Sequence, residues 1–119
     1  MKDINYLKEN GVNPDTLIEE LGIETYNEVM ETFSNEILEK ANKLVESFNS
    51  NNLADYATYA HAIKGEANYL GFTNLLNLSY EQQKRALSGD IEYIRNNIND
   101  YINEINRTIK IAYIYLGKS

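Results

Sequence analysis

Apolar residues recur at every third or fourth position along most of the chain, and this spacing predicts amphipathic α-helices. We expect such helices over about residues 24–47, 53–70, 73–87 and 90–116, with Asp90 capping the last one. Each helix would bury one face and leave the others in solvent. In the helix over 53–70 the buried stripe would comprise Tyr56, Ala60, Ile63, Ala67 and Leu70.

The few helix-breaking residues fall outside these segments. The chain has one proline and six glycines, which is too few for a loop-rich fold. The sequence Asn13-Pro14-Asp15 predicts the start of a short helix that Gly22 ends, with Asn13 as the N-cap and Pro14 at the first helical position. The preceding residues are expected to form a loose lead-in with one helical turn at Ile4 to Lys8.

Four amphipathic helices joined by short turns predict an all-α fold, an antiparallel four-helix bundle over about residues 24–116. Residues 1–22 would supply the lead-in and the short additional N-terminal helix, which would lie across one end of the bundle. A chain of 119 residues is long enough for one hydrophobic core, so residues 1–119 are expected to form a single domain.

The last predicted helix ends in an apolar run, residues 111–116. Ile109, Ile111 and Tyr113 alternate as in a strand, but the helical period persists over roughly 25 residues and a lone strand would have no partner. We therefore expect a helix here. The apolar run would either pack against the short helix at 14–21 or form a dimer contact; we favour the first alternative and expect a monomer.

Composition removes several classes of function. The chain has no cysteine, which excludes disulfides, thiolate metal sites and thiol catalysis. Its 11 Lys and Arg against 18 Asp and Glu give a net charge of −7, which argues against binding to nucleic acid or to an anionic membrane. No segment approaches the roughly 18 consecutive apolar residues of a membrane span, and the N-terminus is too polar for a signal peptide. We expect a cytoplasmic protein.

The charge is unevenly distributed along the chain. Residues 1–60 hold 12 acidic and 4 basic side chains, whereas residues 61–119 hold 6 acidic and 7 basic ones. Acidic residues that simply coat the exposed faces of the early helices would explain this. The alternative is a polarised surface that biases how a partner docks.

The only histidine, His61, marks the one stretch with candidate chemistry. On a helix, Lys64, Gly65 and Asn68 share its side, about 120° around the axis from the buried stripe, so we expect all four to face solvent. One imidazole cannot build a multi-histidine metal site, and we expect no metal here.

An exposed imidazole is mostly neutral at pH 7 and presents a nitrogen lone pair, which makes it a nucleophile. A lysine one turn away would neutralise an incoming phosphoryl group. A helix-interior glycine costs roughly 1 kcal/mol relative to alanine, which indicates either close helix packing or the close approach of a partner at Gly65. Because no acid, base or metal ligand accompanies His61, the stretch is typical of a phosphoryl acceptor, with an ordinary solvated histidine as the alternative.

This stretch resembles the histidine-containing phosphotransfer (HPt) domain family. The family pattern is a histidine, an aliphatic residue two positions later, Lys-Gly at three and four, and a glycine at ten. It is matched here by His61, Ile63, Lys64, Gly65 and Gly71, and the resemblance extends over roughly residues 11–110.

The resemblance implies a phosphorelay intermediate rather than an enzyme. His61 would carry a phosphoryl group on Nε2 and exchange it with an aspartate of a response-regulator receiver domain, or accept it from a histidine kinase. The receiver would supply the magnesium ion, so the resemblance implies no cofactor on this chain.

The resemblance also implies roles for the neighbours of the histidine. Lys64 would orient and neutralise the phosphate, while Gly65 and Asn68 would give the receiver access. A polar side chain from the following helix, Gln83 or Gln82, would add a contact to the phosphate.

Two residues depart from the family pattern. Glu66 stands where a small residue is usual, but its place on the helix puts it on the flank opposite His61. Tyr69 is larger than usual and would either shape the docking surface or be ordinary half-buried packing. A second possible function is a phosphate-independent helical adaptor that binds a partner without phosphate chemistry.

Overall fold

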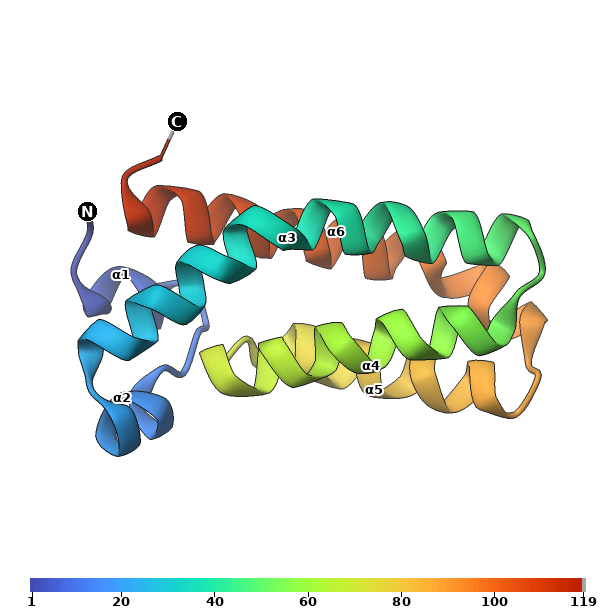
Figure 1. The fold of residues 1–119 in the computed structure, drawn as a ribbon, viewed down its shortest axis with the longest axis horizontal. Coiled ribbons are helices and arrows are strands. Elements are labelled where there is room, and N and C mark those ends of the chain that lie inside the picture. Colours follow the sequence, from blue (N-terminus) through green and yellow to red (C-terminus); the bar gives the residue numbers. More distant parts are fainter. Residues whose placement is uncertain (119) are drawn as a thin grey trace.

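The computed structural model describes residues 1–118 and confirms an all-α fold, with 84% of the chain in helices. Figure 1 shows the helices in chain order. Two short ones come first and four long ones follow, with the bounds α1 Ile4–Glu9, α2 Asp15–Leu21, α3 Ile23–Asn49, α4 Leu53–Leu70, α5 Thr73–Leu87 and α6 Ile91–Leu116.

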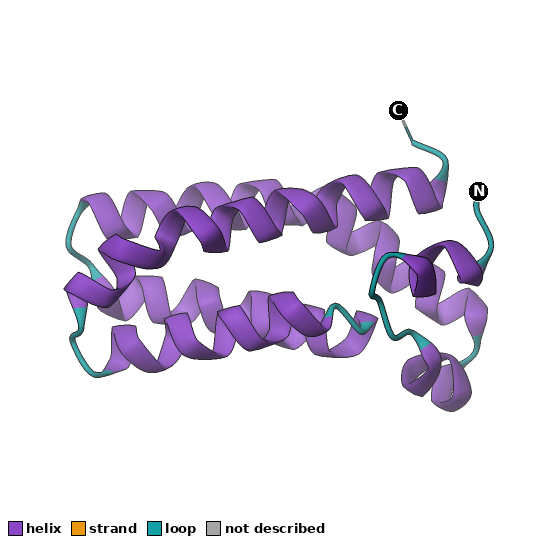
Figure 2. Cartoon of the chain, turned by 180° about the vertical axis from the view of Figure 1, so that it is seen from behind, coloured by secondary structure: helices purple, strands orange, loops and turns teal. Residues whose placement is uncertain are grey.

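The four long helices run alternately up and down, so that neighbours along the chain are antiparallel (Figure 1). Around the bundle α3 packs on α4 and α6, and α5 packs on the same two helices. Both ends of the bundle are closed by short turns, which are visible from behind in Figure 2. The predicted helical bundle is confirmed, and Asp90 caps α6 as expected, accepting a hydrogen bond from the Tyr93 amide.

The N-terminal segment forms two short helices where the pattern predicted one helix and a turn. α1 packs on α6, and α2 packs on α3 and α4. The prediction that Asn13 caps α2 is wrong, since Pro14 holds the N-cap position and α2 begins at Asp15. The backbone N–H of Asn13 donates a hydrogen bond to the carbonyl of Gly71, at 2.8 Å, and the start of α2 has no side-chain cap.

The apolar C-terminal run also packs differently from the expectation. It lies against α1 and the start of α3 rather than against α2. Tyr115 meets Tyr26 edge to face, with ring centroids 6.4 Å apart, and its hydroxyl donates to Asn27. The run is helical throughout and fills the core at this end of the bundle.

Three tyrosines with hydrogen-bonded hydroxyls anchor the core between the long helices. Tyr26 donates to the Leu70 carbonyl and Tyr56 to the side chain of Gln82, both at 2.7 Å; Tyr101 donates to Ser79 at 2.8 Å. Each bond links two different helices, so the tyrosines fix the register between helices as well as filling the core.

A backbone contact joins the N-terminal segment to the α4–α5 turn. Gly71 ends α4 in the left-handed conformation, with φ +82°, which glycine adopts without strain. Asn13 crosses so close to it that a Cβ on Gly71 would lie 1.8 Å from the Asn13 carbonyl oxygen. Val12 and Phe72 form a short antiparallel bridge beside it. Only a glycine fits at position 71.

In the part of the chain that the structure describes, no helix has the length and apolar character needed to cross a membrane.

We predict that Gly71→Ala destabilises the fold strongly, while Gly89→Ala is a milder matched control. Both glycines have φ near +80°, but Gly89 has open space where a Cβ would sit. Left-handed strain should therefore cost about 1–2 kcal/mol at both positions. The clash with Asn13 should add about 1–3 kcal/mol at position 71 alone. Urea unfolding followed by circular dichroism measures both; equal losses would contradict the close contact.

A second prediction concerns alkaline pH. Burial raises the pKa of Tyr26, Tyr56 and Tyr101 well above the ordinary value of about 10. The folded state therefore holds these protons more tightly than the unfolded state does. Stability should be fully present below pH 10 and fall above it, by up to about 1.4 kcal/mol per pH unit for each tyrosine. Urea unfolding between pH 8 and 11.5 measures the slope, and a Tyr56→Phe variant should show a shallower one. A flat profile would contradict the prediction.

Candidate functional site

The candidate site lies on the outer face of the hairpin that α4 and α5 form. Ala60, Ile63 and Ala67 on α4 are buried against the rest of the bundle, as the apolar pattern predicted. His61 and Asn68 are exposed, and Lys64 and Gly65 between them are half-buried. The stripe that the sequence singled out is therefore on the open side of α4.

The register of the hairpin brings α5 residues beside this stripe. His61 and Gln83 each lie eleven residues from Phe72 in the turn, and Lys64 and Tyr80 each lie eight residues from it. Eleven and eight residues are about three and two turns of helix, so both pairs fall on the same face. The Gln83 amide nitrogen lies 3.1 Å from Nδ1 of His61, and the Lys64 ammonium lies 5.7 Å from the centre of the Tyr80 ring.

The structure separates the two glutamines that the sequence left as alternatives. Gln82 is buried and accepts a hydrogen bond from Tyr56, so it belongs to the core. Gln83 is half-buried and reaches the imidazole. Successive helical residues point about 100° apart, which is why neighbours in the sequence serve opposite faces of α5.

The side-chain amide of Gln83 is the hydrogen-bond partner of Nδ1 of His61, so the orientation of the amide and the tautomer of the ring are linked. Amide oxygen and nitrogen exchange places by a 180° turn of the amide group. With Oε1 toward the ring, Nδ1 donates and Nε2 keeps a free lone pair; with Nε2 of the glutamine toward the ring, Nδ1 accepts instead. Contact with a neighbouring hydrogen-bond partner is what selects a histidine tautomer.

Gly65 has nothing within 4 Å of the position where a Cβ would stand. It lies in the interior of α4, where glycine destabilises a helix by about 1 kcal/mol relative to alanine. Close packing within the chain was one of the two explanations for this residue, and the open space excludes it. The open space leaves room for another molecule at this face.

The two departures from the family pattern have clear places in the structure. Glu66 pairs with Lys40 of α3, on the flank of α4 away from His61, and its side chain is only 19% exposed. Tyr69 is 61% exposed, so the interpretation of this residue as half-buried packing is wrong. Tyr69 belongs to the solvent-facing side of the hairpin.

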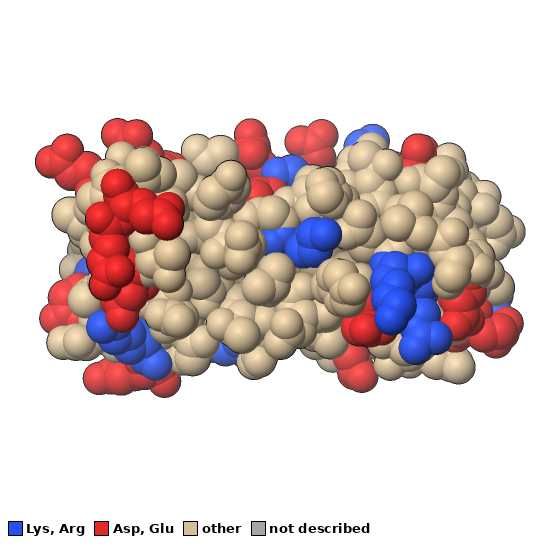
Figure 3. All heavy atoms as spheres, turned by 90° about the horizontal axis from the view of Figure 1, so that it is seen from below, with Lys and Arg blue, Asp and Glu red and all other residues tan. Residues whose placement is uncertain are grey.

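The sequence analysis missed the apolar residues that α5 contributes to this face. Tyr80 is 53% exposed and Leu87 is 70% exposed, and both line a shallow depression beside Lys64 and Gln83. Figure 3 views the molecule from the α4–α5 side and shows the middle of this face as largely uncharged apart from one group of basic atoms. Acidic atoms lie toward both ends of the face, and a larger basic group lies toward the end away from α2. Reflecting α4 positions through the Gly71–Phe72 turn would have identified Tyr80 from the sequence.

The face carries a nucleophile, a cation and an amide, and it is open to a large partner. Among residues 1–118, no three or more histidine, aspartate and glutamate side chains converge where they could hold a metal ion. No family model matches the chain, and no curated protein or solved structure matches it either.

Proposed function

We propose that this protein is a phosphorelay intermediate of the HPt type. In this proposal His61 accepts a phosphoryl group from the aspartate of a receiver domain, or from a histidine kinase, and passes it to another receiver. The observation that carries the proposal is the open space at Gly65, beside an exposed histidine. The fold itself does not require glycine there, whereas a protein that must bring its own aspartate to His61 does.

The chemical step needs only groups that the two proteins supply. The Nε2 lone pair attacks the phosphorus of an aspartyl phosphate, the N–P bond forms, and the P–O bond to the aspartate breaks. The carboxylate leaves with the bonding electron pair, and a magnesium ion held by the receiver would offset the charge on the phosphoryl oxygens. The proton on Nδ1 of His61 stays in place, so no general base is required.

In this proposal, Gln83 and Lys64 both support the transfer step. The Gln83 amide nitrogen faces Nδ1 of His61. A 180° turn of the amide group would bring Oε1 to the ring, where it would accept the Nδ1 proton and leave Nε2 as the nucleophile. Lys64 lies one turn along α4, and the Tyr80 ring holds its ammonium group at the surface. A cation kept there stabilises the negative oxygens of the phosphoryl group during transfer.

The surroundings of His61 suit a protein as the donor and acceptor. Tyr69, Tyr80 and Leu87 are exposed on the same two helices, and exposed aromatic and aliphatic side chains are what protein interfaces bury. The phosphate-independent adaptor would use this apolar surface as well. The two functions differ in whether His61 becomes phosphorylated.

Our third prediction tests that difference. Purified protein is incubated with radiolabelled phosphorylated receiver domains, and separately with phosphoramidate, a small donor that needs no docking surface. Wild type should gain an acid-labile, base-stable label from both kinds of donor. His61→Gln, which keeps a polar side chain at the same place on α4, should gain none from either. A label that survives in His61→Gln, or a wild type left unlabelled by every donor, would overturn the proposal and favour the adaptor.

The fourth prediction uses Gly65→Ala, because fold and function should respond in opposite directions. Open space at the Cβ position means that alanine should stabilise the protein by about 0.5–1 kcal/mol in urea unfolding. The added methyl group should nevertheless slow transfer from a phosphorylated receiver relative to labelling by phosphoramidate, and Gly65→Gln should slow it further. An unchanged ratio in both variants would show that a partner does not need this space.

A further inference from the structure

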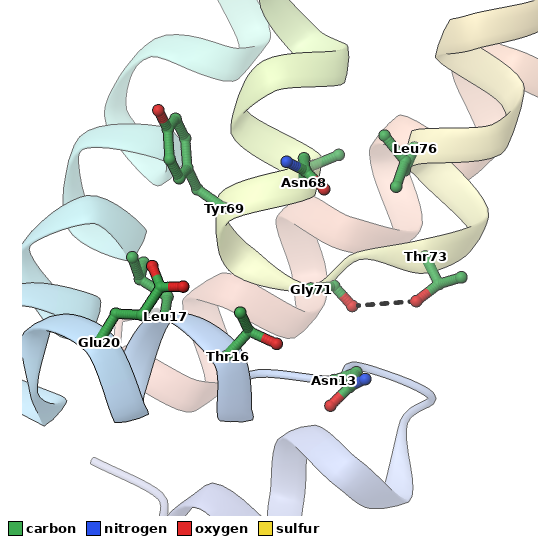
Figure 4. A pocket seen from close by; sticks show the side chains of 10 residues that line it. Asn13, Thr16, Leu17, Glu20, Asn68, Tyr69, Gly71, Thr73 and Leu76 are labelled. Carbon is green, nitrogen blue, oxygen red and sulfur yellow. Dashed lines mark hydrogen bonds between the residues drawn. The ribbon is translucent and has the colours of Figure 1, made fainter.

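A cavity opens on the hairpin face at the end nearest α2. Its volume is about 300 Å³, which is at the small end for ligand sites and suits one inserted side chain better than a whole substrate. Figure 4 shows that α2, the end of α4 and the start of α5 each form part of its wall. Its polar lining residues are Asn13, Thr16, Glu20, Asn68, Tyr69 and Thr73.

The cavity lies within reach of any protein that docks on His61. Asn68 lines it and is seven residues after His61 on the same stripe of α4, a separation of about 10 Å along the helix. A protein interface of ordinary size covers about 800 Å² on each partner, which corresponds to a patch roughly 30 Å across. A partner centred on His61 therefore extends over the cavity.

The charge of the cavity favours a cation. Glu20 is the one charged residue in its lining, and within residues 1–118 no lysine or arginine pairs with it. α4 ends here without a basic residue in its last turn. Within the same part of the chain, no hydrogen bond reaches the carbonyls of Asn68 and Tyr69 at that end. These carbonyls are the negative end of the α4 dipole.

The start of α5 acts in the opposite sense, since its free amides are the positive end of a helix. The two helix ends, each worth about half a charge, roughly cancel, and the full negative charge of Glu20 is left. Figure 3 shows acidic atoms at the α2 end of the face, with basic atoms beside them.

We propose that this cavity receives an arginine side chain of the partner that docks on His61, with Glu20 accepting hydrogen bonds from the guanidinium group. Arginine fits better than lysine because its flat group offers five N–H donors. Glu20 accepts two of them in parallel, and the hydroxyl of Thr16 and the amide oxygen of Asn13 are further acceptors in the lining. The exposed ring of Tyr69 at the rim provides a surface for stacking. The inference rests on the proposed function for the identity of the docked protein.

The cavity is tested without any phosphate chemistry by NMR. Labelled protein is titrated with N-acetyl-arginine amide, and with N-acetyl-citrulline amide as the uncharged probe of the same shape. The arginine probe should shift the backbone amides of Asn13, Thr16, Glu20 and Asn68, and it should do so equally in His61→Gln. Glu20→Gln should weaken this binding about threefold or more, as expected for a solvent-exposed ion pair. Equal binding of the two probes, or shifts elsewhere only, would overturn the proposal.

Glu19→Gln is the matched control, because Glu19 is exposed next to Glu20 on α2 but does not line the cavity. With phosphorylated receiver domains, Glu20→Gln should lower the ratio of receiver transfer to phosphoramidate labelling about tenfold, since the docked partner removes this ion pair from water. Glu19→Gln should leave the ratio unchanged. Equal effects of the two variants would mean that Glu20 acts only through its overall charge, and they would overturn the proposed arginine site.

The outcomes separate this inference from the proposed function. If wild type takes no phosphoryl group from any donor, the proposed phosphorelay function is overturned. Arginine binding that depends on Glu20 would still show that the cavity is an arginine site. If transfer proceeds and Glu20→Gln changes neither the binding of the arginine probe nor the transfer ratio, the cavity proposal alone fails.

Discussion

The turn at Gly71 is the constraint on which the rest of the arrangement depends. Its left-handed conformation ends α4 and sends the chain back as α5, which fixes the register between the two helices. That register alone brings Gln83 to His61 and Tyr80 to Lys64. The same residue lets Asn13 cross at a distance that any side chain would block. One glycine thus positions both the histidine face and the α2 wall of the neighbouring cavity.

The two glycines of the family-like pattern have different physical reasons. Gly71 is required by the chain itself, because of its φ angle and the Asn13 backbone. Gly65 has an ordinary helical backbone and open space beside it, so the folded chain gains nothing from it. The proposed docking of a partner would explain why the helix keeps a destabilising residue beside the only histidine of the chain. That contrast is why Gly65 supports a docking function and Gly71 does not.

The sequence predicted the helices well because their apolar spacing is long and regular, as in the buried stripe of α4. It also placed His61 on the open side of that helix. Its errors are at contacts between distant segments. The local sequence predicted that Asn13 caps α2. Its backbone N–H instead donates a hydrogen bond to the carbonyl of Gly71, 58 residues later in the chain. The sequence left open whether Tyr69 is exposed or half-buried, because a helical wheel does not say which flank a neighbouring helix covers.

The position of the charges on the face bears on how a partner would be oriented. Lys64 and Lys84 line the shallow depression on the hairpin face, where His61 contacts Gln83. Glu20 lines the separate cavity beside α2. In the proposed relay, lysines at the depression and a carboxylate at the cavity would favour one of the two ways in which a partner can lie along the hairpin. In-line transfer tolerates little error in the direction of attack, so fixing that orientation before contact removes unproductive encounters.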